Sequence, residues 1–198
     1  MQLSTNISDY NIILGSKSPR RKEILSKMGI KFKVTQIDFN EDTDLSKPIE
    51  EVAQSISILK ANSFNQLKKN DILICADTIV SVNNKIFGKP ETKEDAFKML
   101  EELSNKKHKV STGVTIKSVT QIKTFYETTF VHFKKLNKAE INYYIENYKP
   151  FDKAGAYGIQ EWIGLIGIEK IEGSYFNVVG LPSSKLYTHL IKFINEEN

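Results

Sequence analysis

The apolar run DILICADTIV at residues 71–80 constrains the fold of this chain more than any other segment. It is short and nearly all apolar, which favours a strand buried at the centre of a sheet over a helix. Its one interior acid, Asp77, is conspicuous, because an isolated carboxylate is costly to bury. Asp77 must therefore be ion-paired, bound to a metal ion or protonated, unless it caps a turn after the strand.

Strand and helix signals alternate through the first half of the chain. The run NIIL at 11–14 predicts a buried strand, and the segment from Ser18 to Gly29 has the N-cap, first-turn proline and terminal glycine of a helix. KFKVTQI at 31–37 predicts a second strand. A helix from 49 to about 67 follows, whose buried face is expected to comprise Val52, Ile56, Leu59 and Ser63.

The second half predicts a hairpin of long strands among helices. Asn83-Asn84 is typical of a hairpin turn, and the β-branched and aromatic residues of 108–119 and 121–133 predict an antiparallel pair. The remaining predicted elements are helices at 92–103, at 138–147 and from Pro182 onward, and a strand at 165–171. Together these elements predict an α/β protein with a mixed β-sheet and one continuous core.

Length and composition fit one globular domain spanning 1–198 and structured over about 11–195. The chain has 198 residues, 40% of them hydrophobic and 26% charged, which is close to globular averages. The net charge of +4 is spread along the chain, which suits a small anionic ligand and does not demand nucleic acid.

The single cysteine and the absence of long apolar runs bear on the compartment. Cys75 is the only cysteine, so neither an internal disulfide nor a Cys/His zinc site is expected, and a reducing compartment fits best. The start MQLSTNISDY is polar, and no stretch is long and apolar enough for a membrane span. We expect a soluble cytosolic protein.

The segment GSKSPRR at 15–21 predicts an anion-binding loop. It connects a buried strand to a helix N-terminus, where free N–H groups and the helix dipole attract anions. Arg20 and Arg21 in the first turn oppose that dipole, and a phosphate chain would supply the negative partner that they need. The alternative is a surface helix whose arginines are solvated. The pattern GxxxxGK[ST] is absent, so the loop is not a P-loop.

Three further charged residues are candidates for the same site. Lys89 lies in GKP, where a glycine and a proline fix the backbone around a cation. Glu41 lies in an acidic loop and Lys60 on the predicted long helix, and on the residues alone a solvated loop and a solvent-facing lysine are the stronger interpretations. With Asp77, these residues describe a site for a metal-bound phosphate ester.

Six blocks of the sequence together resemble the Maf family. They occur in the family's order between about residue 11 and about residue 190, and they are SKSPRR, CADTIV, GKP, LSNKKHKVSTGV, FDKAGAYGIQ and GSYFNVVGLP. The resemblance implies the fold of the inosine triphosphate pyrophosphatase superfamily, an elongated mixed sheet flanked by helices, with two lobes and a central cleft. It also implies a homodimeric nucleoside triphosphate pyrophosphatase, in which water attacks the α-phosphorus with the help of Mg²⁺ or Mn²⁺.

The resemblance implies catalytic roles for four residues. Asp77 corresponds to the residue described in the family as the proton acceptor, and Glu41, Lys60 and Lys89 correspond to its other catalytic positions. Glu41 and Asp77 are the metal ligands implied. The resemblance therefore favours functional roles for Glu41 and Lys60, whose residue types alone favoured solvent-exposed ones.

Five residues are implied in substrate binding. Ser16, Arg20 and Arg21 match the phosphate-binding start of the family, and Thr78 and Gln160 match positions that read the base. ADT followed by GIQ resembles the branch acting on dTTP and UTP, and a glutamine offers the donor and acceptor that thymine or uracil requires.

The sequence departs from the family's pattern in two places. Gly15 replaces a frequent alanine, which should be harmless, and Glu161-Trp162 replaces a frequent glycine beside Gln160. The alternatives to a dTTP/UTP pyrophosphatase are a regulatory binder in septum formation and division arrest, and a pyrophosphatase acting on modified nucleotides or 7-methyl-GTP.

Overall fold

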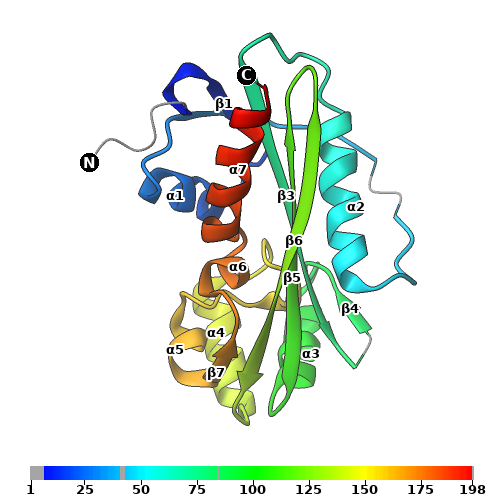
Figure 1. The fold of residues 1–198 in the computed structure, drawn as a ribbon. Helices are drawn as coiled ribbons and strands as arrows, with labels where there is room; N and C mark the ends of the chain where they lie inside the picture. The colour runs from blue at the N-terminus through cyan, green and yellow to red at the C-terminus, as the bar shows by residue number, and fades with distance from the viewer. Residues whose placement is uncertain (1–6, 41–42, 84, 198) are drawn as a thin grey trace.

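The computed structural model describes residues 7–40, 43–83 and 85–197, which form a mixed seven-stranded sheet flanked by helices (Figure 1). The strand order is β2-β1-β3-β5-β6-β7, and β4 also pairs with β3. The pairs β1–β2 and β1–β3 are parallel and the others antiparallel. The strands are β1 (Asn11–Leu14), β2 (Phe32–Val34), β3 (Asp71–Val82), β4 (Lys85–Phe87), β5 (Lys107–Lys117), β6 (Ile122–Phe133) and β7 (Ile168–Glu172).

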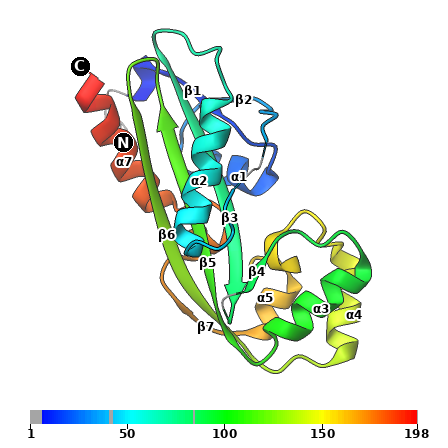
Figure 2. The ribbon, with the colours of Figure 1, turned by 90° about the vertical axis from the view of Figure 1, so that its right-hand side faces the viewer.

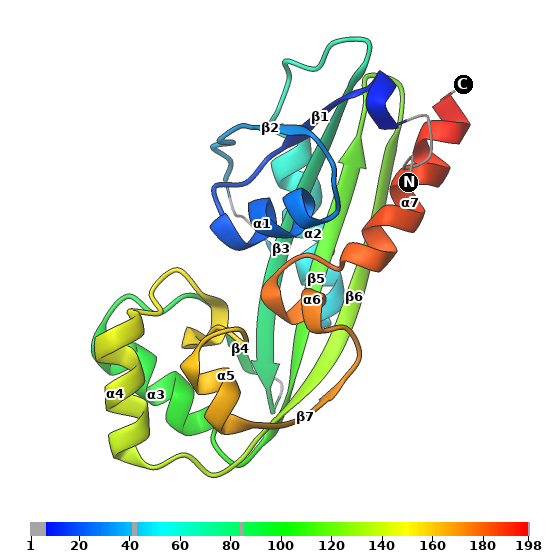
Figure 3. The same cartoon turned by 90° about the vertical axis from the view of Figure 1, so that its left-hand side faces the viewer.

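The helices cover both faces of this sheet and one end of it. They are α1 (Pro19–Lys27), α2 (Ile49–Asn62), α3 (Lys93–Leu103), α4 (Lys138–Tyr148), α5 (Trp162–Gly167), α6 (Tyr175–Val179) and α7 (Ser183–Glu197), with short 3-10 turns at Ile7–Asp9 and Ala154–Ala156. Figures 2 and 3 show α2 on one face and α1 and α7 on the other, while α3, α4 and α5 gather at the far end. No helix in the described ranges is long and apolar enough to cross a membrane.

The buried side chains divide the molecule into two lobes. One large cluster joins α1 and α7 to β1 and one half of β3 and β5, and we call this half the α7 lobe. The other joins α3, α4 and α5 to the opposite halves of β3, β5 and β6, and we call it the α4 lobe. The expectation of one continuous core was therefore wrong, because the long strands extend past one set of helices into another (Figure 3).

Local signals explain why most elements begin and end where they do. Ser18 caps α1 with Pro19 in the first turn, and Thr92 and Asp95 form a capping box at α3. Val82 pairs with Lys85 across the predicted turn, where Asn83 has a φ of 50°. Asn84 lies outside the described residues.

Three predicted elements were wrong in part. The strand predicted at 31–37 comprises only Phe32–Val34. The second helix ends at Asn62, so its buried face comprises Ile49, Val52, Ala53, Ile56, Ser57 and Ala61, whereas Ser63 is its exposed C-cap. The segment predicted as a strand at 165–171 is helical up to Gly167 and extended only from Ile168. A short apolar run fits either structure, and here the spacing of the buried Ile163 and Gly167 matches a helix.

Candidate active site

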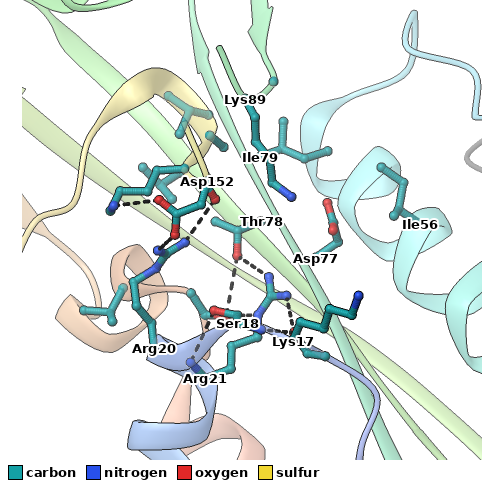
Figure 4. Close-up of a pocket in the computed structure, with 18 of the residues that line it drawn as sticks. Lys17, Ser18, Arg20, Arg21, Ile56, Asp77, Thr78, Ile79, Lys89 and Asp152 are labelled. Carbon is teal, nitrogen blue, oxygen red and sulfur yellow. Dashed lines mark hydrogen bonds and ion pairs between the residues drawn. The ribbon is translucent and has the colours of Figure 1, made fainter. Parts of the chain in front are cut away.

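A cavity of about 930 Å³ lies between the two lobes, which is within the range typical of small-molecule sites (Figure 4). Its wall includes the β1–α1 loop, part of α2, the middle of β3, the β4–α3 connection and the segments around 152–160 and 178–180. Among its described lining residues, two are carboxylates and six are cations, namely Lys17, Arg20, Arg21, Lys60, Lys89 and Lys153. A net positive charge is thus concentrated in the cavity, which favours a polyanion.

The cavity opens where the edge of β3 is left uncovered. β1 pairs with β3 only as far as Ile74, and β4 pairs with β3 only from Val80 onward. Between these points, the described strands leave one edge of β3 without a neighbour. Because side chains alternate along a strand, Asp77 points to the α2 face and Thr78 to the opposite face, and a ligand at this edge can reach both.

Asp77 lies in the middle of β3, so the interpretation that it caps a turn after the strand was wrong. Its carboxylate forms an ion pair with the ammonium group of Lys60 on α2, and both side chains are less than one-fifth exposed. The Lys60 ammonium also lies over the ring of Phe39, 4.9 Å from its centre. The buried acid is therefore paired, and the solvent-facing interpretation of Lys60 was also wrong.

Lys89 brings a further cation toward the same space. Figure 4 shows its side chain extending from the β4–α3 connection toward Asp77. No described carboxylate forms an ion pair with Lys89 or with Lys17, which lines the cavity from the β1–α1 loop. With respect to the described carboxylates, both cations are available to an incoming anion.

The β1–α1 loop has the geometry predicted for it. The side chain of Ser18 accepts a hydrogen bond from the backbone N–H of Arg21, and Ser16 Oγ accepts one from the N–H of Ser18 at 3.2 Å. Gly15 lets the loop pass close to the sheet, because a Cβ there would lie 2.6 Å from Ile37 Cδ1 and 2.7 Å from Cys75 Sγ. In this chain, Ile37 and Cys75 fill the space that an alanine methyl group would need.

Arg21 is held by three parts of the protein. It donates hydrogen bonds to Gly180 O at 2.8 Å, to Thr78 Oγ1 at 3.1 Å and to Ser16 Oγ at 3.3 Å. Burial lowers the pKa of its guanidinium. Arg21 therefore ties α1 to β3 and to the end of α6.

Arg20 reaches across the cavity instead. Its Nη1 lies 2.5 Å from Asp152 Oδ2, and its Nη2 donates to the backbone O of Asp152 at 3.4 Å. Partial burial alone would raise the pKa of Asp152, but hydrogen bonds from Lys153 and Arg20 outweigh it and the pKa is lowered. The negative partner that the sequence required for Arg20 is thus a protein carboxylate in this structure.

Thr78 and Gln160 both line the cavity, Thr78 from the middle of β3 and Gln160 from the α4 lobe. Thr78 Oγ1 is 2.9 Å from Thr112 Oγ1 in addition to its contact with Arg21, so the hydroxyl is firmly held. Gln160 is exposed and lines the cavity from the loop before α5. The structure therefore brings together eight of the nine predicted site residues, whereas Glu41 lies outside the described residues.

The described residues include no cluster of three or more His, Cys, Asp or Glu side chains that could hold a metal ion. Asp77 is one carboxylate in a cavity suited to a polyanion. Mg²⁺ in proteins is often held by one or two carboxylates together with substrate phosphates and water. Asp77 therefore fits a divalent cation that arrives with its ligand, and does not by itself form a permanent metal site.

The sequence analysis missed Asp152 and Lys153. Both line the cavity, and both lie in the block FDKAGAYGIQ, which gave the resemblance but no role for these two residues. An adjacent acid and base in a glycine-rich segment was the available signal. Asp152, however, pairs with Arg20, which is 132 positions away in the sequence, and Lys153 pairs with Glu161, which is 8 positions away. Sequence spacing could not reveal these pairs.

Comparison with known proteins gives matches over nearly the whole chain. The family model described as Maf-like protein matches residues 11–193. A protein of Flavobacterium johnsoniae named dTTP/UTP pyrophosphatase is 44% identical over 193 residues, covering 97% of this chain and 100% of that protein. A protein of the same name from Phocaeicola vulgatus is 48% identical over 190 residues, covering 94% of this chain and 98% of that protein.

A solved structure supports the fold prediction. The HAM1 protein from Coxiella burnetii superposes on this chain with a TM-score of 0.50 and 13% identity, covering 92% of this chain and 99% of that one. At this level of identity the likeness concerns the fold alone. The predicted class, a mixed sheet flanked by helices, is confirmed.

Proposed function

This chain belongs to the family of Maf-like proteins, and from that premise we propose that it is a nucleoside triphosphate pyrophosphatase that hydrolyses dTTP and UTP. The observation that carries the proposal is the cavity at the open edge of β3, which is lined by six described cations and two described carboxylates, one of them Asp77. A nucleoside triphosphate consists of a polyanionic triphosphate and a polar base. The cations of this cavity suit the triphosphate, and the amide of Gln160 suits the base.

The proposed reaction consumes one water molecule. The water oxygen forms a bond to the α-phosphorus, the bond between that phosphorus and the oxygen bridging to the β-phosphate breaks, and pyrophosphate leaves with the electron pair. Asp77 accepts the proton of the attacking water as general base. Lys60, which is paired with Asp77, keeps the carboxylate aimed into the cavity.

The cations stabilise the charge that moves onto the leaving group. Lys89 has no ion-pair partner among the described residues, and Arg20 is held by a carboxylate that is half exposed. Arg20 is therefore held in place before substrate arrives, and preorganised charge of this kind is typically the largest contribution to such catalysis. Ser16 adds a hydroxyl, and the positive end of the α1 helix dipole favours an anion.

A divalent cation, Mg²⁺ or Mn²⁺, completes the proposed site. Asp77, together with Glu41 and the substrate's own phosphate oxygens, would hold it, and when bound it supplies positive charge to the triphosphate. Ser16, Arg20 and Lys89 are proposed to bind and orient the phosphates with either cation.

Gln160 and Thr78 are proposed to select the base. The Gln160 amide can donate to a carbonyl and accept from the ring N3–H of thymine or uracil, a pairing that cytosine cannot match. Thr78 is fixed by Arg21 and Thr112 and so presents its hydroxyl in one position. We propose further that the chain is a single-domain cytosolic enzyme and acts as a homodimer, as the sequence resemblance implies.

Product analysis across a panel of nucleotides tests this function. With Mg²⁺ or Mn²⁺ present, dTTP and UTP should give the monophosphate and pyrophosphate, CTP should react more slowly, and chelation of the cation should stop the reaction. Measurement of pyrophosphate and orthophosphate separately, for canonical, methylated and other modified triphosphates, identifies the bond broken. Release of orthophosphate with a diphosphate, or turnover of none of these nucleotides, would contradict the proposal.

A further inference from the structure

A chain of ion pairs and hydrogen bonds extends from Arg20 into the α4 lobe. Arg20 pairs with Asp152 Oδ2, and Asp152 Oδ1 lies 2.7 Å from the ammonium group of Lys153. That ammonium lies 3.0 Å from Glu161 Oε1, and Glu161 Oε2 accepts a hydrogen bond from the hydroxyl of Tyr144. The three inner members, Asp152, Lys153 and Glu161, each contact two other members of this network.

The inner end of this network, at Lys153 and Tyr144, is fixed by burial. The side chain of Lys153 is 9% exposed and Tyr144 is fully buried. The Tyr144 hydroxyl also accepts a hydrogen bond from the N–H of Gly158 at 3.0 Å. A Cβ at Gly158 would lie 2.8 Å from Glu161 Cδ, so the carboxyl group packs directly on that backbone. Burial of a lysine is costly unless it is paired, and here two carboxylates balance the charges of Lys153 and Arg20.

At its outer end, this network of ion pairs crosses the cavity from Asp152 to Arg20. Arg20 belongs to α1 and the α7 lobe, whereas Asp152, Lys153 and Glu161 belong to the α4 lobe, and Figure 4 shows Arg20 and Asp152 facing each other. Glu161 directly follows Gln160, which lines the same cavity. One continuous set of contacts therefore joins a phosphate-facing cation to the residue beside the proposed base reader.

We infer that Asp152, Lys153 and Glu161 are positioning residues that hold Arg20 in place for the triphosphate and couple its position to the loop carrying Gln160. The inference rests on the proposed function, because it assigns these residues a part in the same reaction. Glu161 fixes Lys153, Lys153 fixes one oxygen of Asp152, and the other oxygen of Asp152 orients the Arg20 guanidinium. Loss of the charge on Glu161 would leave Lys153 to compete with Arg20 for Asp152.

A double-mutant cycle separates positioning from a merely structural role. Glu161→Gln keeps the shape of the side chain and removes its charge. In the otherwise native chain we expect it to lower kcat/KM for dTTP about tenfold, and in an Arg20→Ala background less than twofold, because coupled residues are not additive. Glu102→Gln, which breaks the surface pair Lys85–Glu102 of 2.8 Å, is the matched control and should leave kcat/KM unchanged.

The outcomes are distinct from those that test the function itself. An equal loss of kcat/KM in both backgrounds would overturn the inference while leaving the pyrophosphatase activity in place. A native chain without pyrophosphate release would overturn the proposed function, and the inference with it. If Glu161→Gln does not fold, Asp152→Asn replaces it in the double-mutant cycle. In the Arg20→Ala background, Asp152→Asn should likewise lower kcat/KM less than twofold.

Discussion

Adjacent residues in this site have different environments and different tasks. Arg21 is enclosed and makes three hydrogen bonds to the protein, whereas Arg20 extends across the cavity to a carboxylate. Asp77 and Thr78 point to opposite faces of β3, one toward Lys60 and the other toward Arg21. Alternation along a strand and rotation along a helix point neighbours in sequence toward different parts of the protein.

Replacement of Asp77 by asparagine tests the proposed general base. Asn keeps the size of the side chain but cannot accept the proton, so kcat for dTTP should fall by about 10² to 10⁴, the usual loss for such a group. Binding of a dTTP analogue with a non-hydrolysable α–β linkage should persist, as measured by calorimetry.

Asp71→Asn is the matched control for this substitution. Asp71 lies on the same strand, outside the cavity, where it accepts hydrogen bonds from Asn11 and from the backbone N–H of Lys68. Its replacement should affect stability and leave kcat within twofold of the native value. A near-native kcat for Asp77→Asn would show that another group accepts the proton.

At the level of elements, the contact between α2 and β5 decides where Lys60 lies. Gly113 on β5 pairs with Asp77 on β3, and a Cβ at Gly113 would lie 2.2 Å from the backbone O of Ala53 on α2. The helix backbone therefore rests directly on the sheet beside Asp77. This close approach lets a lysine one and a half to two turns further along the helix reach the buried acid.

Gly113→Ala should push this helix off the sheet. The obstructing atoms belong to backbone and cannot rotate away, so we expect the free energy of unfolding to fall by about 3 kcal/mol, as in severe overpacking. Urea unfolding measures the change. Gly88→Ala is the control, because a Cβ there meets no atom within 4 Å and should alter stability by under about 0.5 kcal/mol. Equal effects of the two substitutions would contradict the packing argument.

Elements with a complete local signal could be predicted from the sequence. The cap at Ser18, the apolar run of β3 and the turn at Asn83 carry their own chemistry, and all three are confirmed. The boundary between α5 and β7 could not be predicted, because WIGLIGI is apolar in either conformation and only its packing selects the helix. The helix α6 was missed for a related reason, since its five residues are too few to show a period.

For the whole molecule, the sequence predicted several of the charged residues that line the cavity, but it did not predict how they pair. Residue types and the family resemblance indicated Asp77, Lys60 and Arg20, which the structure places around one cavity. That Arg20 pairs with Asp152, however, depends on how two lobes meet across the cavity. Contacts between residues 132 positions apart leave no periodic trace in the sequence.

The stability of the whole fold should fall in mild acid because of His108. This side chain is 1% exposed and bonded to Tyr157, and burial lowers its pKa from 6.5 to about 4, with a smaller lowering by His132 and a partial offset by the backbone of Lys106. The unfolded chain therefore binds a proton between pH 6.5 and 4 that the folded one does not. The stabilisation is present above pH 6.5 and is lost as the pH falls toward 4.

This one group should remove about 2 kcal/mol of unfolding free energy between pH 7 and pH 5, from the difference between the two pKa values. Urea unfolding at both pH values measures the loss. The His108→Gln protein cannot titrate at this position, so between pH 7 and pH 5 it should lose about 2 kcal/mol less unfolding free energy than the native protein. His189 is present in both proteins and contributes equally to both losses. If both proteins lost stability equally, His108 would not be the source.

The three long strands that pass unbroken through both lobes also limit how the enzyme can move. Two lobes joined by a flexible loop can move by hinge bending, but here the lobes are joined by β3, β5 and β6, which are held by antiparallel hydrogen bonds along their length. A hinge motion that opened the cavity would have to bend these three strands. Nucleotide entry and pyrophosphate exit therefore depend on side chains and loops at the mouth, and turnover has no large domain motion to wait for.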